Sequence, residues 1–242
     1  MFVLSDLDLG MNNWMSDPFP YPTEAWDRGK VLSEDDLAKL PKFERYRDVD
    51  GDGIPYRTLP GVRDPKGAYF TRGSGHDEAA RYTESPEVYR RVMDRLARKH
   101  ETAKQLVPAP VIEEADGAEV GIIAYGSSHW AVVESRDQLE QAGVRTGYLL
   151  LRALPFTAEV KRFVQRYRRV YVVEQNRDAQ MAELLRVETG VDRDRLRSAL
   201  HYTGLPIDAR SVTDEILRQE GQPIATGETR RSASEIEEGV SR

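Results

Sequence analysis

Three apolar runs separated by two amphipathic segments constrain the fold of this chain more than any other feature. The runs are Val120–Tyr125, Gly147–Leu151 and Val170–Val173. The first amphipathic segment follows Ser128 and extends to Ala142, and the second is Ala158–Tyr167. Strands that alternate with helices in this way form parallel sheets covered on both faces, and such strands need no polar alternation. The pattern predicts an α/β domain over 113–220, with an open parallel sheet and crossover helices.

The turn after the first apolar run is a candidate binding site. Gly126, Ser127 and Ser128 follow the predicted strand and begin a helix. In open parallel sheets, ligands bind beyond the carboxyl ends of the strands, and a helix N-terminus offers free N–H groups to an anion. We predict that these three residues bind a substrate or an anion. The simpler alternative is that Ser128 only caps the helix.

Composition limits the function classes that the chain can belong to. Among its 242 residues there is no cysteine, 39% are hydrophobic, and the formal net charge is −6. The chain therefore holds no disulfide, thiolate nucleophile or cysteine-bound iron–sulfur cluster, and the charge does not indicate nucleic-acid binding. No apolar stretch approaches the ~20 residues that cross a bilayer. We expect a cytoplasmic protein that binds neither nucleic acid nor membrane.

The first thirty residues are predicted to be extended. Phe2–Leu9 reads as an apolar strand, either at the edge of a sheet or at the end of a longer domain. Gly10–Lys30 carries prolines, which fix φ and remove hydrogen-bond donors, among the aromatic residues Trp14, Phe19, Tyr21 and Trp26. These aromatic side chains must be covered, either by a partner at an interface or by the rest of the same domain.

Two loops carry candidate ligands. Asp48–Gly53 alternates carboxylates as a calcium loop does, but Leu59 replaces the expected bidentate glutamate, so the alternative is a solvated turn. We assign no metal site. Arg57, on the rigid proline-containing stretch that follows, reads as a buried residue. It is a candidate ligand for a carboxylate or phosphate, and the alternative is a structural ion pair.

The segment Phe70–Glu78 contains the densest set of reactive side chains. It combines Arg72 and His76 with two glycines and two acids. Glycines allow close approach of the backbone to a ligand, and a histidine can transfer a proton near neutral pH. We predict Arg72 and His76 as catalytic candidates. The alternative is an ordered loop with a hydrogen-bonded histidine.

Several further helices are predicted from caps and periodicity. A long helix starts at Ser85–Pro86 and runs to about Leu106; its predicted inward stripe is Val88, Val92, Met93 and Leu96. Its arginines are interleaved with acids and are predicted to form a solvated face. Other predicted helices are 33–40, which is capped by Ser33, 178–188, and a last helix that is capped by Ser211 and ended by Gly221. The polar tail 221–242 is predicted to be disordered.

Four segments together resemble one known family. They are Ser5–Trp14, Gly51–Gly61, Phe70–Glu78 and Ala124–Ser127. In their residues and in their order along the chain, these segments resemble the alpha subunit of 2-oxoacid:ferredoxin oxidoreductases, and most of all the 2-oxoglutarate type. The likeness runs from about residue 2 to residue 217.

The resemblance implies a domain organisation and a set of cofactors. Residues 1–112 would be the end of a pyrimidine-binding domain with an aromatic arm, loops and a linker helix, and 113–220 a transketolase-C-like domain. The complete enzyme would use thiamine diphosphate with Mg, an iron–sulfur cluster and coenzyme A, and would reduce ferredoxin. A beta subunit would carry the cluster and the diphosphate-binding domain. The gamma domain and most of the pyrimidine-binding domain would lie on an N-terminal alpha/gamma portion, before Met1.

Two expectations follow for this chain. We expect it to hold none of these cofactors alone and to act only in a hetero-oligomer with its partner chains. Arg57, Arg72 and His76 are inferred from local chemistry and are not transferred from the family. The alternatives are a non-catalytic interaction or scaffold module derived from the family, and a small anion-binding domain that uses Gly126–Ser128.

Overall fold

The computed structural model describes residues 2–73 and 75–224. The chain divides into two compact units, and each is described by itself. The first unit contains the sheet and comprises Met1–Asn13, Pro110–Arg152 and the chain from Glu159. The second unit is mostly loops around one long helix and comprises Trp14–Ala109 and Ala153–Ala158.

The first unit is built on a five-stranded sheet with the order β1-β3-β2-β4-β5. The strands are β1 Val111–Glu113, β2 Val120–Tyr125, β3 Thr146–Leu151, β4 Arg169–Glu174 and β5 Leu196–Leu200. Strands β2 to β5 pair in parallel, which confirms the predicted open α/β sheet with crossover helices. The prediction was incomplete at both edges: no strand was predicted at β1, which pairs antiparallel with β3, and residues 196–202 were left undecided between a helix end and the strand β5.

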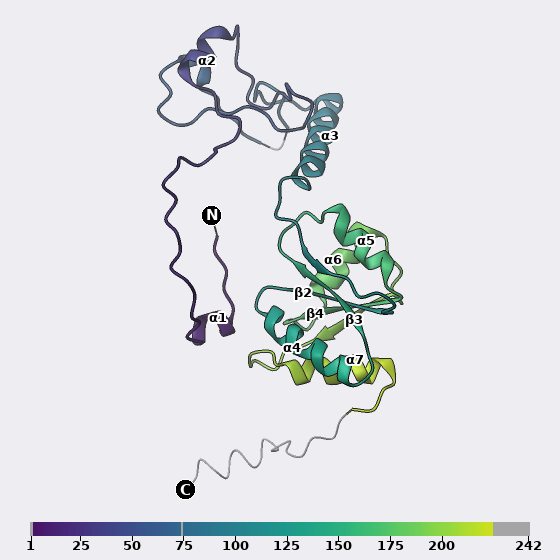
Figure 1. Ribbon diagram of the computed structural model, residues 1–242. Helices are drawn as coiled ribbons and strands as arrows, with labels where there is room; N and C mark the ends of the chain where they lie inside the picture. The colour runs from purple at the N-terminus through teal and green to yellow at the C-terminus, as the bar shows by residue number, and fades with distance from the viewer. Residues whose placement is uncertain (1, 74, 225–242) are drawn as a thin grey trace. The chain divides into compact units, whose positions relative to one another are not determined.

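Helices cover both faces of this sheet. They are α4 Ser128–Gln141, α5 Ala158–Arg166, α6 Gln180–Thr189 and α7 Ala209–Glu220. Helices α4 and α7 lie on one face and α5 and α6 on the other (Figure 1). Ile122 of β2 is fully buried in one cluster with Val132 of α4 and Ile216 of α7, so the first face is the main core. Such two-sided cover explains why the strands read as continuous apolar runs.

On the opposite face, two paired glycines make room for a tyrosine of the chain that leaves α5. Gly121 of β2 and Gly147 of β3 lie opposite each other in the parallel register. Tyr167 is 1% exposed and lies across both of them. A Cβ atom added to Gly147 would stand 1.9 Å from the Tyr167 hydroxyl oxygen. Only glycine fits there, because the ring packs directly on the backbone of the sheet.

Two helix starts differ from the predicted ones. The N-cap of α4 is Ser127, which makes no side-chain cap bond, so the predicted cap at Ser128 is wrong. Helix α7 is capped by Asp208, whose carboxylate accepts a hydrogen bond from the N–H of Ser211 at 2.8 Å. The predicted cap at Ser211 is wrong because an earlier acid takes the role. Gly221 ends α7 in the left-handed region, as predicted.

The second unit confirms two predicted helices. Helix α2, Glu34–Lys39, has a capping box formed by Ser33 and Asp36, and η1, Pro65–Gly67, is a short 3-10 turn. Helix α3, Pro86–Ala103, is capped by Ser85. The buried side chains of α3 are Val92 and Arg95, whereas Met93 and Leu96 are 45% and 41% exposed. The predicted stripe is therefore wrong in part, because α3 packs a charged residue against a neighbouring loop.

The predicted strand at Phe2–Leu9 is wrong. The structure has a short helix, α1 Leu7–Met11, whose N-cap Asp6 accepts a hydrogen bond from the N–H of Leu9 at 2.9 Å. A strand needs a neighbour to pair with, and no strand among residues 2–73 and 75–224 pairs with this segment. The segment instead forms one short helix with a local cap.

The aromatic arm is extended and uncovered. Its residues Trp14, Phe19, Tyr21 and Trp26 are 49%, 89%, 89% and 75% exposed. Packing onto the same domain was therefore the wrong alternative, and a role at an interface stays a prediction. From residue 225 onwards, the predicted disordered tail lies outside the described residues. In the part of the chain that is described, no helix is both long and apolar enough to cross a bilayer.

Candidate functional site

The strand order places a topological switch point between β2 and β4. From β2 the chain passes to β3 on one side, and later to β4 on the other. In open α/β sheets, ligands bind in the crevice at the carboxyl ends of such strands. Ser127 and Ser128 follow β2, and Gln175 follows β4. The structure thus brings the predicted serines to the edge where a ligand is expected.

Gln175 joins the two serines into one polar group. Its Nε2 donates to the hydroxyl oxygen of Ser127 at 2.9 Å and to that of Ser128 at 3.2 Å. Ser127 also donates to the carboxylate of Asp6. The N–H of Leu9, followed by the Ser127 hydroxyl, lowers the pKa of Asp6. A carboxylate of the chain therefore lies at the start of α4, in keeping with the preference of a helix N-terminus for negative charge.

A second carboxylate fills the neighbouring helix N-terminus from inside the protein. Glu174, the last residue of β4, is fully buried. Its oxygens accept hydrogen bonds from the N–H groups of Met181 and Ala182 at 2.8 and 3.0 Å, and from Asn176 Nδ2 at 2.8 Å. Glu174 thus satisfies backbone N–H groups at the start of α6 that the N-cap residue cannot, because Ala179 has no side-chain acceptor.

The Tyr125 hydroxyl donates to the same carboxylate at 3.3 Å. Burial, together with the negative charge of Glu174, raises the pKa of Tyr125 to about 12. Tyr125 therefore stays protonated and remains a donor at neutral pH. Sequence reasoning assigned no role to Glu174 or Gln175, although polar residues that directly end a buried strand were the available signal.

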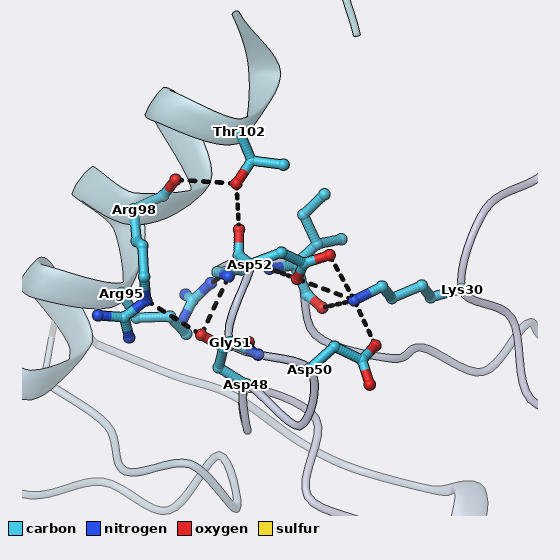
Figure 2. Close-up of polar contacts among 10 residues, drawn as sticks. Lys30, Asp48, Asp50, Gly51, Asp52, Arg95, Arg98 and Thr102 are labelled. Atoms are coloured by element: carbon cyan, nitrogen blue, oxygen red, sulfur yellow. Dashed lines mark hydrogen bonds and ion pairs between the residues drawn. The ribbon is translucent and has the colours of Figure 1, made fainter. Parts of the chain in front are cut away.

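In the second unit, a lysine pairs with two carboxylates of the loop that resembles a calcium loop. Lys30 Nζ lies 2.6 Å from Asp50 Oδ2 and 2.7 Å from Asp52 Oδ2, and it donates to the carbonyl of Ile54 at 3.1 Å (Figure 2). The ammonium group thus balances two of the loop carboxylates. Across residues 2–73 and 75–224, no three or more His, Cys, Asp or Glu side chains are grouped to hold a metal.

The same loop is fastened to α3. Thr102 Oγ1 donates to the Asp52 carbonyl at 2.6 Å, and Arg95 Nη1 donates to the Gly53 carbonyl at 2.9 Å (Figure 2). Gly53 has φ +79°, and a Cβ atom on it would lie 2.3 Å from the backbone nitrogen of Lys99. The glycine that resembled part of a calcium motif therefore allows the loop to touch the helix backbone.

The structure separates Arg57 from its predicted role. Arg57 is exposed, so its predicted burial is wrong. Its Nη2 donates to the carbonyl of Arg28 at 2.8 Å, and its backbone forms an isolated bridge with Val31. The side chain thus joins two loop segments. A role in binding an anion stays a prediction.

Arg72 and His76 are linked through one tyrosine. The Arg72 guanidinium lies over the Tyr82 ring, 5.9 Å from its centroid, and Tyr82 pairs with His76 in an antiparallel bridge. The His76 ring lies 4.1 Å from that of Tyr46, and its Nδ1 is 3.0 Å from the Asp77 carbonyl. Both side chains have structural partners. Their catalytic roles stay predictions.

Fold and site together define an open, doubly wound α/β domain with a polar switch point, preceded by a loop-rich unit. No protein-family model matches the sequence. The chain is nevertheless similar to 2-oxoacid:ferredoxin oxidoreductase 2, subunit alpha, of Aeropyrum pernix, with 28% identity over 208 residues. It is 25% identical over 196 residues to the corresponding alpha subunit of Saccharolobus solfataricus. These matches cover 84% and 78% of this chain, but only 30% and 29% of the two relatives.

A solved structure gives the same picture of the fold. The 2-oxoglutarate:ferredoxin oxidoreductase from Magnetococcus marinus, solved with 2-oxoglutarate, coenzyme A and succinyl-CoA bound, matches with a TM-score of 0.64 and 22% identity. The match covers 81% of this chain and 32% of that one. The resemblance inferred from the sequence, to the alpha subunits of 2-oxoacid:ferredoxin oxidoreductases, is thereby confirmed. The chain spans about a third of the length of these three proteins.

Proposed function

We propose that this chain forms the C-terminal part, or a separate split portion, of the alpha subunit of a 2-oxoacid:ferredoxin oxidoreductase. With its partner chains it would catalyse the oxidative decarboxylation of a 2-oxoacid to an acyl-CoA, with 2-oxoglutarate as the expected substrate. One observation carries the proposal. The similarity to alpha subunits extends over both units of the chain, covering 84% of it, and is not confined to the common α/β domain.

The residues of this chain do not fit the family's cofactors. The sequence contains no cysteine to bind an iron–sulfur cluster. In the described part of the chain, no group of carboxylates or histidines is placed to hold the Mg that accompanies thiamine diphosphate. The proposal therefore assigns the cluster and thiamine diphosphate to a beta subunit and an N-terminal alpha/gamma portion. This chain would contribute protein surface around the reaction and would not be active alone.

The aromatic arm supports association with another chain. Phe19 and Tyr21 are each 89% exposed and Trp26 is 75% exposed, on an extended segment that contains Pro18, Pro20 and Pro22. Aromatic side chains provide much of the binding energy at protein interfaces, and a proline-stiffened segment loses less entropy on binding. The arm is therefore the part of this chain that we expect to contact a partner subunit.

Reconstitution tests the proposal. This chain would be co-expressed with a cluster-bearing beta subunit and an N-terminal alpha/gamma portion. Reduction of ferredoxin would then be followed with 2-oxoglutarate and coenzyme A. We expect reduction that needs both substrates and stops when this chain is omitted, and pyruvate in place of 2-oxoglutarate tests the substrate assignment. A full set of chains with intact cofactors and no turnover on any 2-oxoacid would refute the enzymatic role.

The alternative is a non-catalytic interaction module derived from the same family. The exposed arm favours it as much as it favours the enzyme, because both require a partner. The same reconstitution separates the two. A stable complex whose turnover is identical with and without this chain would support the module.

A further inference from the structure

Three arginines line one side of a depression beside α3. Arg91, Arg95 and Arg98 are spaced i, i+4 and i+7, which places them on one face of the helix. The depression has a volume of about 430 Å³, and the chain opposite the helix contributes Glu44, Tyr46 and Asp48 to its lining. Sequence reasoning treated these arginines as part of a solvated face.

The outer two arginines have acidic partners. Arg91 Nε lies 3.2 Å from Glu78 Oε1, and Arg98 Nε lies 3.2 Å from Asp48 Oδ2. The Asp48 carboxylate also accepts hydrogen bonds from the N–H groups of Gly51 and Gly53 at 2.9 and 3.0 Å. Its hydrogen-bonding capacity is therefore largely used, and it has little left to offer a further cation.

The middle arginine is buried without such a partner. Arg95 is only 7% exposed, and its Nε has no hydrogen-bond partner among the described residues. Its Nη1 donates to the neutral carbonyl of Gly53 at 2.9 Å, and it makes no ion pair with a carboxylate of the described chain. Burial lowers the pKa of Arg95, and the charge of Asp48 opposes this only in part. A buried charge of this kind is costly unless a counter-ion meets it.

The remaining charges of the lining suggest what that counter-ion is. A fourth arginine, Arg47, is paired with Glu44 at 3.2 Å, which leaves Arg95 and Asp94 as the lining charges without an ion pair in the described chain. A guanidinium group holds two oxygens of an oxyanion in a fork. An ionised carboxylate such as Asp94 can only accept hydrogen bonds, so it favours an oxyanion that still carries a proton.

We propose that this depression binds a phosphate group, with Arg95 as the principal ligand. Arg91 and Arg98 lie beside it, and Asp94 accepts the hydrogen bond of a protonated phosphate oxygen. Sulfate, which carries no proton at neutral pH, is the poorer ligand. The proposal rests on the geometry of α3 and does not depend on the oxidoreductase function proposed above.

A titration of the full chain with inorganic phosphate at pH 7 tests this site. Ionic strength is held constant with sodium chloride, and binding is followed by calorimetry and by amide chemical shifts. We expect one saturable site, with sulfate binding at least tenfold more weakly. Arg95→Met and Arg91→Met should each weaken phosphate binding at least tenfold. Lys99→Met, an exposed cation on the same helix outside the depression, should leave it unchanged.

Two further results decide the interpretation. Arg91→Met keeps the test valid if Arg95→Met fails to fold, because Arg91 is largely exposed, with 57% of its side chain accessible. Asp94→Asn should reduce the difference in binding affinity between phosphate and sulfate. Glycerol phosphate distinguishes the source: binding at least as tight as that of the free ion identifies a phosphate monoester, and weaker binding identifies inorganic phosphate. The proposal would be overturned if the chain showed no saturable phosphate binding, or if both arginine variants bound phosphate as tightly as the unaltered chain does.

Discussion

Glu174 gives the sharpest test of how the switch-point edge is held together. It is fully buried and accepts hydrogen bonds from two backbone N–H groups of α6, from Asn176 and from the Tyr125 hydroxyl. We expect Glu174→Ala to lower the free energy of unfolding because the start of α6 loses its acceptors and the half-buried Tyr125 hydroxyl loses its carboxylate partner.

The magnitude follows from the number and type of contacts. Each hydrogen bond to a charged group contributes about 1.5 kcal/mol at the lower end of the usual range, and the long bond from the Tyr125 hydroxyl contributes about 1 kcal/mol. The two bonds to the α6 backbone and the bond from the hydroxyl together give a loss of about 4 kcal/mol. Glu174→Gln keeps the shape and one acceptor oxygen, so its loss should be about 2 kcal/mol.

Urea unfolding followed by circular dichroism measures these losses. The matched control is Glu183→Gln on the same helix, which removes a carboxylate with a 59% exposed side chain that pairs with Arg186. We expect the control to change stability by less than about 0.5 kcal/mol. An unfolding midpoint for Glu174→Gln equal to that of the unaltered chain would refute the view that the charge stabilises α6.

Three other perturbations have defined outcomes. Gly147→Ala should destabilise the chain by about 3 kcal/mol in thermal unfolding, because the added methyl overlaps Tyr167; adding Tyr167→Leu should recover part of the loss, and no recovery would argue against the overlap. Burial, with the hydrogen bond to Glu220, raises the pKa of Tyr171 to about 12, so the folded state holds this proton more tightly than the unfolded state. Stability should therefore fall as the pH rises from about 10 to 12, less steeply in Tyr171→Phe; equal slopes would contradict this assignment. Lys30→Met should leave two aspartates without their cation and produce calcium-dependent stabilisation that the unaltered chain lacks; a calcium titration without effect on the variant would show that the lysine is not what balances them.

The sequence by itself determined the three inner strands of the sheet and most helices. A short apolar run such as Val120–Tyr125, bounded by turn residues, indicates a strand covered on both sides, and caps such as Ser33 and Ser85 act within one turn of chain. The family resemblance was also readable, since it depends on the order of local motifs. Such features need no knowledge of distant neighbours.

Only the tertiary structure decided which side chains meet. Ser127 and Ser128 lie about fifty positions before Gln175 in the sequence. They come into contact with it because β2 and β4 are neighbours in the sheet. The sequence pattern predicted Arg95 on a solvated face, but in the structure the loop that ends at Gly53 packs against it. Burial and pairing arise from contacts between segments far apart in the sequence, so local pattern cannot fix them. The sites of this protein are therefore set by packing, while its framework is set by periodicity.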